Sequence, residues 1–134
     1  MLDNIQDVDL TGVPTCQTDT VNSGAGGNVD VSIILPTGAL YILKAWALGH
    51  NDIAARQAVV VLTDAISTVS IPIETIAAFA ATATPLVDMT KVKGSVLLAP
   101  GGIRAHATFV SVGANKDCFI TSFFHRVQGV QPLV

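Results

Sequence analysis

The sequence predicts an all-β protein, built as an antiparallel sandwich or barrel. Its apolar segments are short, alternate at period two and are rich in β-branched residues. Turn signals made of Pro, Gly, Asn and Asp separate these segments at intervals near the 8 to 12 residues, roughly, that such folds show. The length of 134 residues suits one domain with a substantial core. We therefore expect seven or eight strands in a single domain.

Residues 1–27 are expected to form an extended acidic arm that ends in a Gly-rich loop. The first 30 residues contain five Asp and no Lys or Arg, which leaves residues 31–134 with a net charge of +2. Such a segment buries too little apolar surface to offset its conformational entropy unless a partner orders it. The Gly cluster at 23–27 lacks the Lys-Ser or Lys-Thr of a phosphate-binding loop, so we interpret it as a flexible connection. The sandwich domain is then expected over residues 28–134.

Three strands are predicted in the first half of this domain. Residues 28–35 place Val and Ile on one face and Asp and Ser on the other, which indicates a half-buried strand. A Pro-Thr-Gly turn at 36–38 follows. Residues 40–49 and 57–62 are predicted to pair as a hairpin across the polar loop 50–56.

The next segments are less uniform. Residues 65–73 are β-branched and predict a strand, and Pro72 indicates a sheet edge or the end of that strand. Residues 74–84 leave helix and strand both open, because Ala favours helix whereas Thr and the β surroundings do not. Residues 92–99 are predicted to form another strand, followed by a Pro-Gly-Gly turn.

The longest predicted feature is an antiparallel hairpin over residues 103–127. Two ten-residue runs flank the break Gly-Ala-Asn-Lys-Asp at 113–117, whose residues are typical of hairpin turns. One register sets Phe109 opposite Thr121, and a register one residue tighter sets it opposite Ile120. The pattern does not choose between them, since a one-residue slip exchanges the two faces. Both faces carry Phe in either register, which indicates burial on both sides.

Composition excludes several function classes. No stretch reaches the about 20 apolar residues of a spanning helix, so no membrane segment is expected. No basic cluster is present, which argues against binding nucleic acid. No export signal is visible at the acidic amino terminus, so Cys16 and Cys118 are expected to be free thiols in a protein made in the cytosol.

No residue set points to catalysis, a metal or a cofactor. The three histidines, His50, His106 and His125, lack further ligands nearby and are expected to be structural or on the surface. Cys118 lies among Phe and Ile and is interpreted as a small core side chain. The Asp residues that could form catalytic pairs, at 52, 64, 88 and 117, lie in predicted turns, where Asp bonds backbone groups. The protein is therefore not expected to be an enzyme or to need a cofactor.

Two aromatic residues could stack on a sugar, as in carbohydrate-binding modules. Tyr41 and Trp46 differ by an odd number, however, so in a regular strand they would point to opposite faces. Trp46 is expected in the core or at a subunit contact. What remains unusual is the apolar strand surface: charged residues are only 13% of the chain and half of its residues are hydrophobic. Exposed apolar patches mark association sites, and sheet edges need cover, so self-association is expected.

The order of segments resembles small virion structural proteins of tailed bacteriophages, in particular capsid decoration or cement proteins. The residues that carry the likeness are LYILKAWALGHNDIAARQAVVVLTDA (40–65), VLLAPGGIRAHATFVSV (96–112) and the closing CFITSFFHRV (118–127). The resemblance implies a jelly-roll-like sandwich and a homo-oligomer, with a trimer favoured. It implies the major capsid protein as partner, on the exterior of a virion assembled in the host cytoplasm.

On this hypothesis the protein stabilises the head by binding between major capsid subunits, and the arm makes the contact. The partner-binding residues predicted on the arm are Asp3, Ile5, Asp7, Val8, Asp9 and Leu10. The alternatives are a tail or head-accessory structural protein, or a carbohydrate- or receptor-binding module that would need an exposed aromatic near Trp46 or in the loop 50–56.

Overall fold

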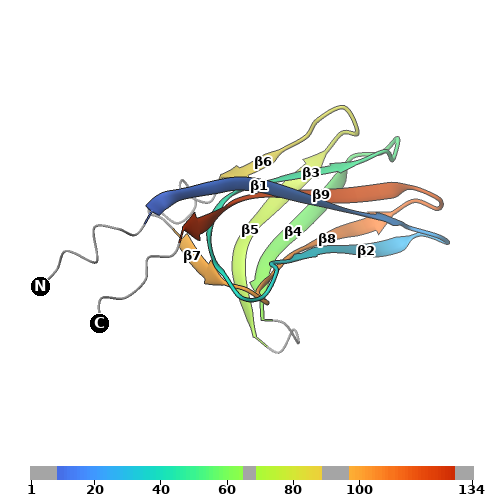
Figure 1. The fold of residues 1–134 in the computed structure, drawn as a ribbon. Helices are drawn as coiled ribbons and strands as arrows, with labels where there is room; N and C mark the ends of the chain where they lie inside the picture. The colour runs from blue at the N-terminus through green and yellow to red at the C-terminus, as the bar shows by residue number, and fades with distance from the viewer. Residues whose placement is uncertain (1–8, 65–68, 89–96, 129–134) are drawn as a thin grey trace, which may run out of the picture.

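The computed structural model describes residues 9–64, 69–88 and 97–128, and these form two antiparallel sheets packed face to face (Figure 1). The strands are β1 (Asp9–Asn22), β2 (Gly27–Ile34), β3 (Leu40–His50), β4 (Arg56–Thr63), β5 (Ser70–Phe79), β6 (Leu86–Asp88), β7 (Leu97–Pro100), β8 (Arg104–Val112) and β9 (Asp117–Gln128). The prediction of an all-β antiparallel sandwich is confirmed.

The strand order is that of a jelly roll. One sheet, here sheet A, has the order β1-β9-β3-β6, and β7 also pairs with β3. The other, sheet B, has the order β2-β8-β4-β5. Strands β6 and β7 follow one another along the same edge of β3, so together they complete the fourth position of sheet A. Successive strands alternate between the sheets from β1 to β4, whereas β4 and β5 are neighbours in sheet B. The alternation resumes from β7 to β9, as two Greek keys produce it.

The predicted hairpin over residues 103–127 is wrong. Strand β8 pairs with β2 and β4 in sheet B, whereas β9 pairs with β1 and β3 in sheet A. Phe109 faces Val29 and Ala58, and Ile120 faces Asp19 and Leu48. The short break at 113–116 therefore crosses from one sheet to the other. Burial on both sides is not observed either: each strand turns one face to the shared core, so Phe109 and Phe124 are buried whereas Phe123 is 39% exposed.

The second predicted hairpin is wrong for the same reason. Strands β3 and β4 occur where they were expected, but they lie in different sheets and the loop 51–55 joins the two layers. Residues 1–27 were expected to form an extended arm and a Gly-rich loop outside the sandwich, but Asp9–Asn22 form β1, which pairs along β9 within sheet A. The Gly cluster is an ordered turn in which Gly24, Gly26 and Gly27 have positive φ. Residues 1–8 lie outside the described residues.

Most other strands occur near their expected positions. Strand β2 buries Val29, Val31 and Ile33, as its alternation predicts. Of the strand expected at 65–73, residues 65–68 lie outside the described residues. Strand β5 covers Ser70–Phe79, so most of the ambiguous segment 74–84 belongs to it. It is an edge strand of sheet B, as Pro72 indicates. Of the strand expected at 92–99, residues 92–96 lie outside the described residues and 97–100 form β7.

The core lies between the sheets, and aromatic side chains from both sheets are buried in it. Trp46, Phe109 and Phe124 are among its largest fully buried members. The ring of Tyr41 packs edge-on against Phe124, with centroids 5.2 Å apart. Its hydroxyl donates to the Pro36 carbonyl at 2.9 Å, so burial leaves that polar group satisfied.

Candidate functional site: the loop end of the sandwich

The loops between β1 and β2, β3 and β4, β5 and β6, and β8 and β9 gather at one end of the sandwich (Figure 1). Hydrogen bonds tie three of them together. The Ser23 hydroxyl donates to the Gly113 carbonyl at 2.5 Å and accepts the Lys116 N–H at 2.8 Å. Asn51 exchanges two bonds with Asp117, at 2.8 and 3.1 Å. This end, called the loop end below, is therefore a connected surface and not four independent loops.

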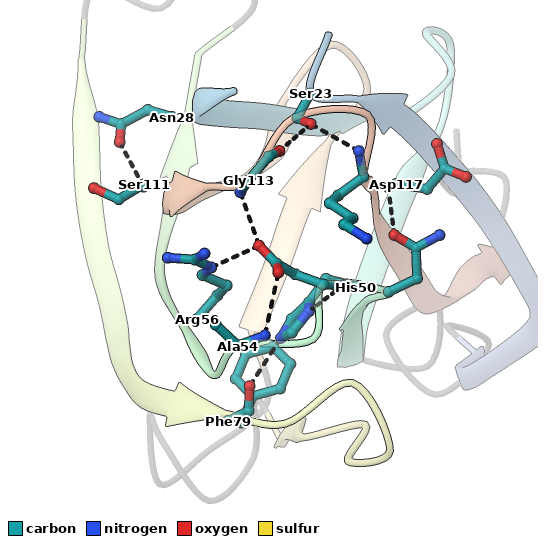
Figure 2. Close-up of polar contacts among 12 residues, drawn as sticks. Ser23, Asn28, His50, Ala54, Arg56, Phe79, Ser111, Gly113 and Asp117 are labelled. Atoms are coloured by element: carbon teal, nitrogen blue, oxygen red, sulfur yellow. Dashed lines mark hydrogen bonds and ion pairs between the residues drawn. The ribbon is translucent and has the colours of Figure 1, made fainter. Parts of the chain in front are cut away.

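Asp52 is the centre of this network (Figure 2). Its Oδ2 accepts the Gly113 N–H at 2.8 Å and the Arg56 Nε–H at 2.7 Å, and its Oδ1 accepts the Ala54 N–H at 3.2 Å. The side chain is almost fully buried. The Gly113 N–H, followed by the Ala54 N–H and the Arg56 side chain, holds the pKa of this carboxyl well below its usual range. Asp52 is thus a buried carboxylate that clamps the β3–β4 loop to the β8–β9 loop.

His50 extends the network to β5. Its Nδ1 accepts the N–H of Asp52 at 3.1 Å, so the ring proton lies on Nε2, which donates to the Phe79 carbonyl at 2.8 Å (Figure 2). The ring also contacts the rings of Phe79 and Phe109. His50 is therefore a structural side chain, as expected, although it is buried.

The clamped loop displays an apolar tip. Ile53 follows Asp52 directly and is 95% exposed, the most exposed large hydrophobic side chain among the described residues. Ala54 and Ala55 beside it are exposed as well. Neighbouring Ala80, Ala81 and Ala83 in the β5–β6 loop are also exposed. The loop end thus presents small and aliphatic side chains on a backbone that hydrogen bonds hold in place. The only sequence signal for this tip is weak: Ile53 lies inside a polar turn, where nothing local requires an apolar residue.

Of the predicted partner-binding residues, Asp9 and Leu10 lie at the end of the sandwich opposite the loop end. Asp9 and Leu10 start β1, where Asp9 pairs with Gln128. Asp3, Ile5, Asp7 and Val8 lie outside the described residues. Because β1 runs from that end to the loop end, the structure does not bring Asp9 and Leu10 close to Ile53.

The described residues offer no ready catalytic arrangement. His106 lies in sheet B, 3.3 Å from Asp30, and His125 lies in sheet A. Cys118 is fully buried, and burial raises the pKa of its thiol to about 11, so it is protonated near neutral pH. Cys16 is exposed, and both thiols are free. Across the described ranges no three His, Cys, Asp or Glu side chains are grouped to hold a metal ion, and no helix there is long and apolar enough to cross a membrane.

The sugar-stacking platform is also absent at Tyr41 and Trp46, for a reason that corrects the sequence argument. The pairing of β3 with β9 shifts between Leu43 and Ala45, so the alternation is interrupted at Lys44. Tyr41 and Trp46 consequently face the same core, where both are buried. Neither ring can stack on a ligand.

Comparison with known proteins gives distant structural likenesses only. No protein-family model matches the chain, and no curated protein sequence does. Among solved structures, Bacillus endospore appendages match with a TM-score of 0.45 and 10% identity, over 85% of this chain and 87% of that one. The carbohydrate-binding module CBM29-2 matches with 0.41 and 12%, over 82% and 75%. A protein of infectious bursal disease virus, Gx strain, matches with 0.36 and 9%, over 88% of this chain and 38% of that one. At these scores the fold is established by the strand order of the chain itself.

Proposed function

We propose that the protein is a non-enzymatic structural component of a virion, which decorates the capsid exterior and stabilises the head by binding between major capsid subunits. The observation that carries the proposal is the exposed Ile53 tip on a loop that Asp52 clamps. The sequence resemblance to decoration proteins and the jelly-roll strand order support it.

An aliphatic tip of this kind suits a protein partner. Burying a whole Ile side chain contributes about 1.5–3 kcal/mol. Because the clamp already fixes the backbone of the loop, little further conformational entropy is lost on binding. Isolated apolar anchors that fill a pocket often dominate protein interfaces. A sugar-binding site would instead present aromatic faces, and both Tyr41 and Trp46 are buried.

The arm supplies the second contact in this proposal. Its carboxylates Asp3, Asp7 and Asp9 and its apolar residues Ile5, Val8 and Leu10 bind the shell or a neighbouring subunit. Since β1 begins at Asp9 and ends at the loop end, the arm and Ile53 contact different parts of the assembly. A protein anchored at both ends bridges subunits, which is how a decoration protein stabilises a shell.

The test is co-sedimentation with capsid shells that lack the protein. We expect Ile53→Asp to weaken binding by about tenfold or more, since a carboxylate cannot enter an apolar pocket without a partner. Removing residues 1–8 should also weaken binding while leaving β1 intact. Cys16→Asp, at an exposed position within β1 and away from the loop tip, is the matched control and should bind like the parent chain. Unchanged binding by both Ile53→Asp and the truncated chain would refute the proposal.

A further inference from the structure

Arg56 is the first residue of β4 and follows the Ile53 tip by three positions. Its Nε–H donates to Asp52 Oδ2 at 2.7 Å, and its backbone pairs with Phe79 of β5. The Arg56 side chain is 23% exposed, whereas the Asp52 side chain is only 3% exposed. The guanidinium is therefore held from its buried side and reaches the surface of the loop end.

The two Nη groups of Arg56 are available to a partner. Among the described residues none accepts a hydrogen bond from them, and neither nitrogen is one of the buried polar atoms that lack a partner. Both groups therefore reach solvent. Figure 2 shows Arg56 on the opposite side of the network from Asp117, whose carboxylate accepts from Asn22. The Nη groups thus form the unoccupied donor edge of a guanidinium that is already fixed in place.

We propose that Arg56 binds a carboxylate of the capsid partner, beside the apolar pocket that receives Ile53. The inference rests on the proposed function and names the chemistry that the loop end recognises. The planar end of an arginine offers parallel N–H donors that match the two oxygens of a carboxylate. Because Asp52 and β4 already hold the guanidinium, binding orders few further torsions. The exposed Ile53 excludes water from the new ion pair when the partner docks, which strengthens the pair.

The charges of the loop end favour a single carboxylate over a polyanion. The charged side chains of its four loops and of the strand ends that flank them are two of each sign: Asp52, Arg56, Lys116 and Asp117. A surface with no net charge gives no general attraction to the phosphates of a nucleic acid. The N–H groups of Gly113 and Ala54 also stabilise the Asp52 charge. Arg56 can therefore bind a second carboxylate while it keeps the first.

The experiment measures co-sedimentation with capsid shells that lack the protein, before and after carbodiimide and glycinamide convert the shell carboxylates to amides. The parent chain should bind amidated shells about tenfold or more weakly, the usual cost of losing a charge-assisted hydrogen bond. Arg56→Lys keeps the positive charge but loses the paired donors, and should bind untreated shells about tenfold or more weakly. On amidated shells this variant and the parent chain should bind alike. Lys116→Gln removes the other positive charge of the loop end and is the control, which should bind like the parent chain on both shells.

The two shells separate recognition from a purely structural role of Arg56. If Arg56→Lys loses the same factor on both shells, the residue acts only by holding Asp52 and the inference is overturned. Parent binding that amidation does not change would also overturn it, since the acceptor would then be neutral or a phosphate. Arg56→Lys that binds untreated shells like the parent chain has the same consequence. In each of these cases the proposed function stands if Ile53→Asp still weakens binding, so the two ideas can fail separately.

Discussion

Asp52 shows how one residue organises the loop end. The Asp52 carboxylate accepts the Ala54 N–H, which is a local turn contact of the kind that Asp commonly forms. The sequence predicts such a backbone-bonded turn residue at this position. The bond from Gly113 joins residues 61 positions apart. No local pattern encodes that contact, because it exists only once β8 delivers Gly113 to the same end of the sandwich as β3.

Asp52→Asn should lower the melting temperature by several degrees at neutral pH. The substitution removes a buried charge that accepts three bonds and leaves the Arg56 guanidinium without its carboxylate. Since the pKa of Asp52 is lower in the folded protein than the roughly 3.9 of an unfolded chain, its stabilisation is complete above that value and is lost as pH falls below it.

Thermal unfolding of both proteins from pH 7 to pH 2 measures this effect. The difference between the parent chain and Asp52→Asn should be constant above about pH 5 and should shrink below about pH 4. Asp117→Asn, whose carboxylate is exposed and accepts from Asn22, is the control and should change little. A gap that stays the same size down to pH 2 would contradict the role assigned to the Asp52 charge.

At the scale of elements, the sequence predicted which segments form strands better than it predicted which strands pair with each other. Alternation defines which residues of a strand share a face, and this worked for β2. It does not define which strand lies alongside. A short break such as 113–116 usually joins neighbours in one sheet, but here it joins β8 and β9 across the core. The hint available was that the two runs, paired as a hairpin, would carry Phe on both faces; in the sandwich, Phe109 of sheet B and Phe124 of sheet A are both buried in the shared core.

The sequence pattern of a single strand also could not predict that Tyr41 and Trp46 point to the same face. Counting residues predicts the face of a side chain only while the strand is regular. The interruption at Lys44 shifts the alternation by one residue, so Tyr41 and Trp46, an odd number of positions apart, point to the same face. Bulges are set by neighbouring strands, so the sequence of β3 alone could not reveal it. The expectation that Trp46 lies in the core is confirmed.

Trp46→Ala should destabilise the domain by about 3–5 kcal/mol, the usual cost of removing a large buried aromatic side chain. The indole lies fully within the core, and its Nε1–H has no hydrogen-bond partner among the described residues, so packing alone accounts for its contribution. Chemical denaturation followed by circular dichroism measures the loss. Phe123→Ala, at a side chain that is 39% exposed, is the comparison and should cost clearly less. Equal losses at the two positions would be inconsistent with the buried placement of Trp46.

At the scale of the molecule, one copy of the sandwich hides its core but not all of its apolar surface. Exposed large hydrophobic side chains occur on several elements among the described residues; they are Ile34, Leu40, Ile53, Val69, Ile71, Leu86 and Phe123. Scattered apolar residues are ordinary on protein surfaces. Among them, Ile53 forms the clamped loop tip and Ile71 lies on the edge strand β5, and exposed apolar side chains at both places suit contacts with other proteins. The sequence indicated the excess of apolar surface, but only the fold shows where it lies.

The mass of the purified chain at increasing concentration tests the central claim most directly. If the protein is a self-associating structural component, light scattering will give a multiple of 13.9 kDa that falls toward the chain mass on dilution. A mass of one chain at every concentration, up to about the millimolar range in which even weak edge contacts are populated, would contradict it.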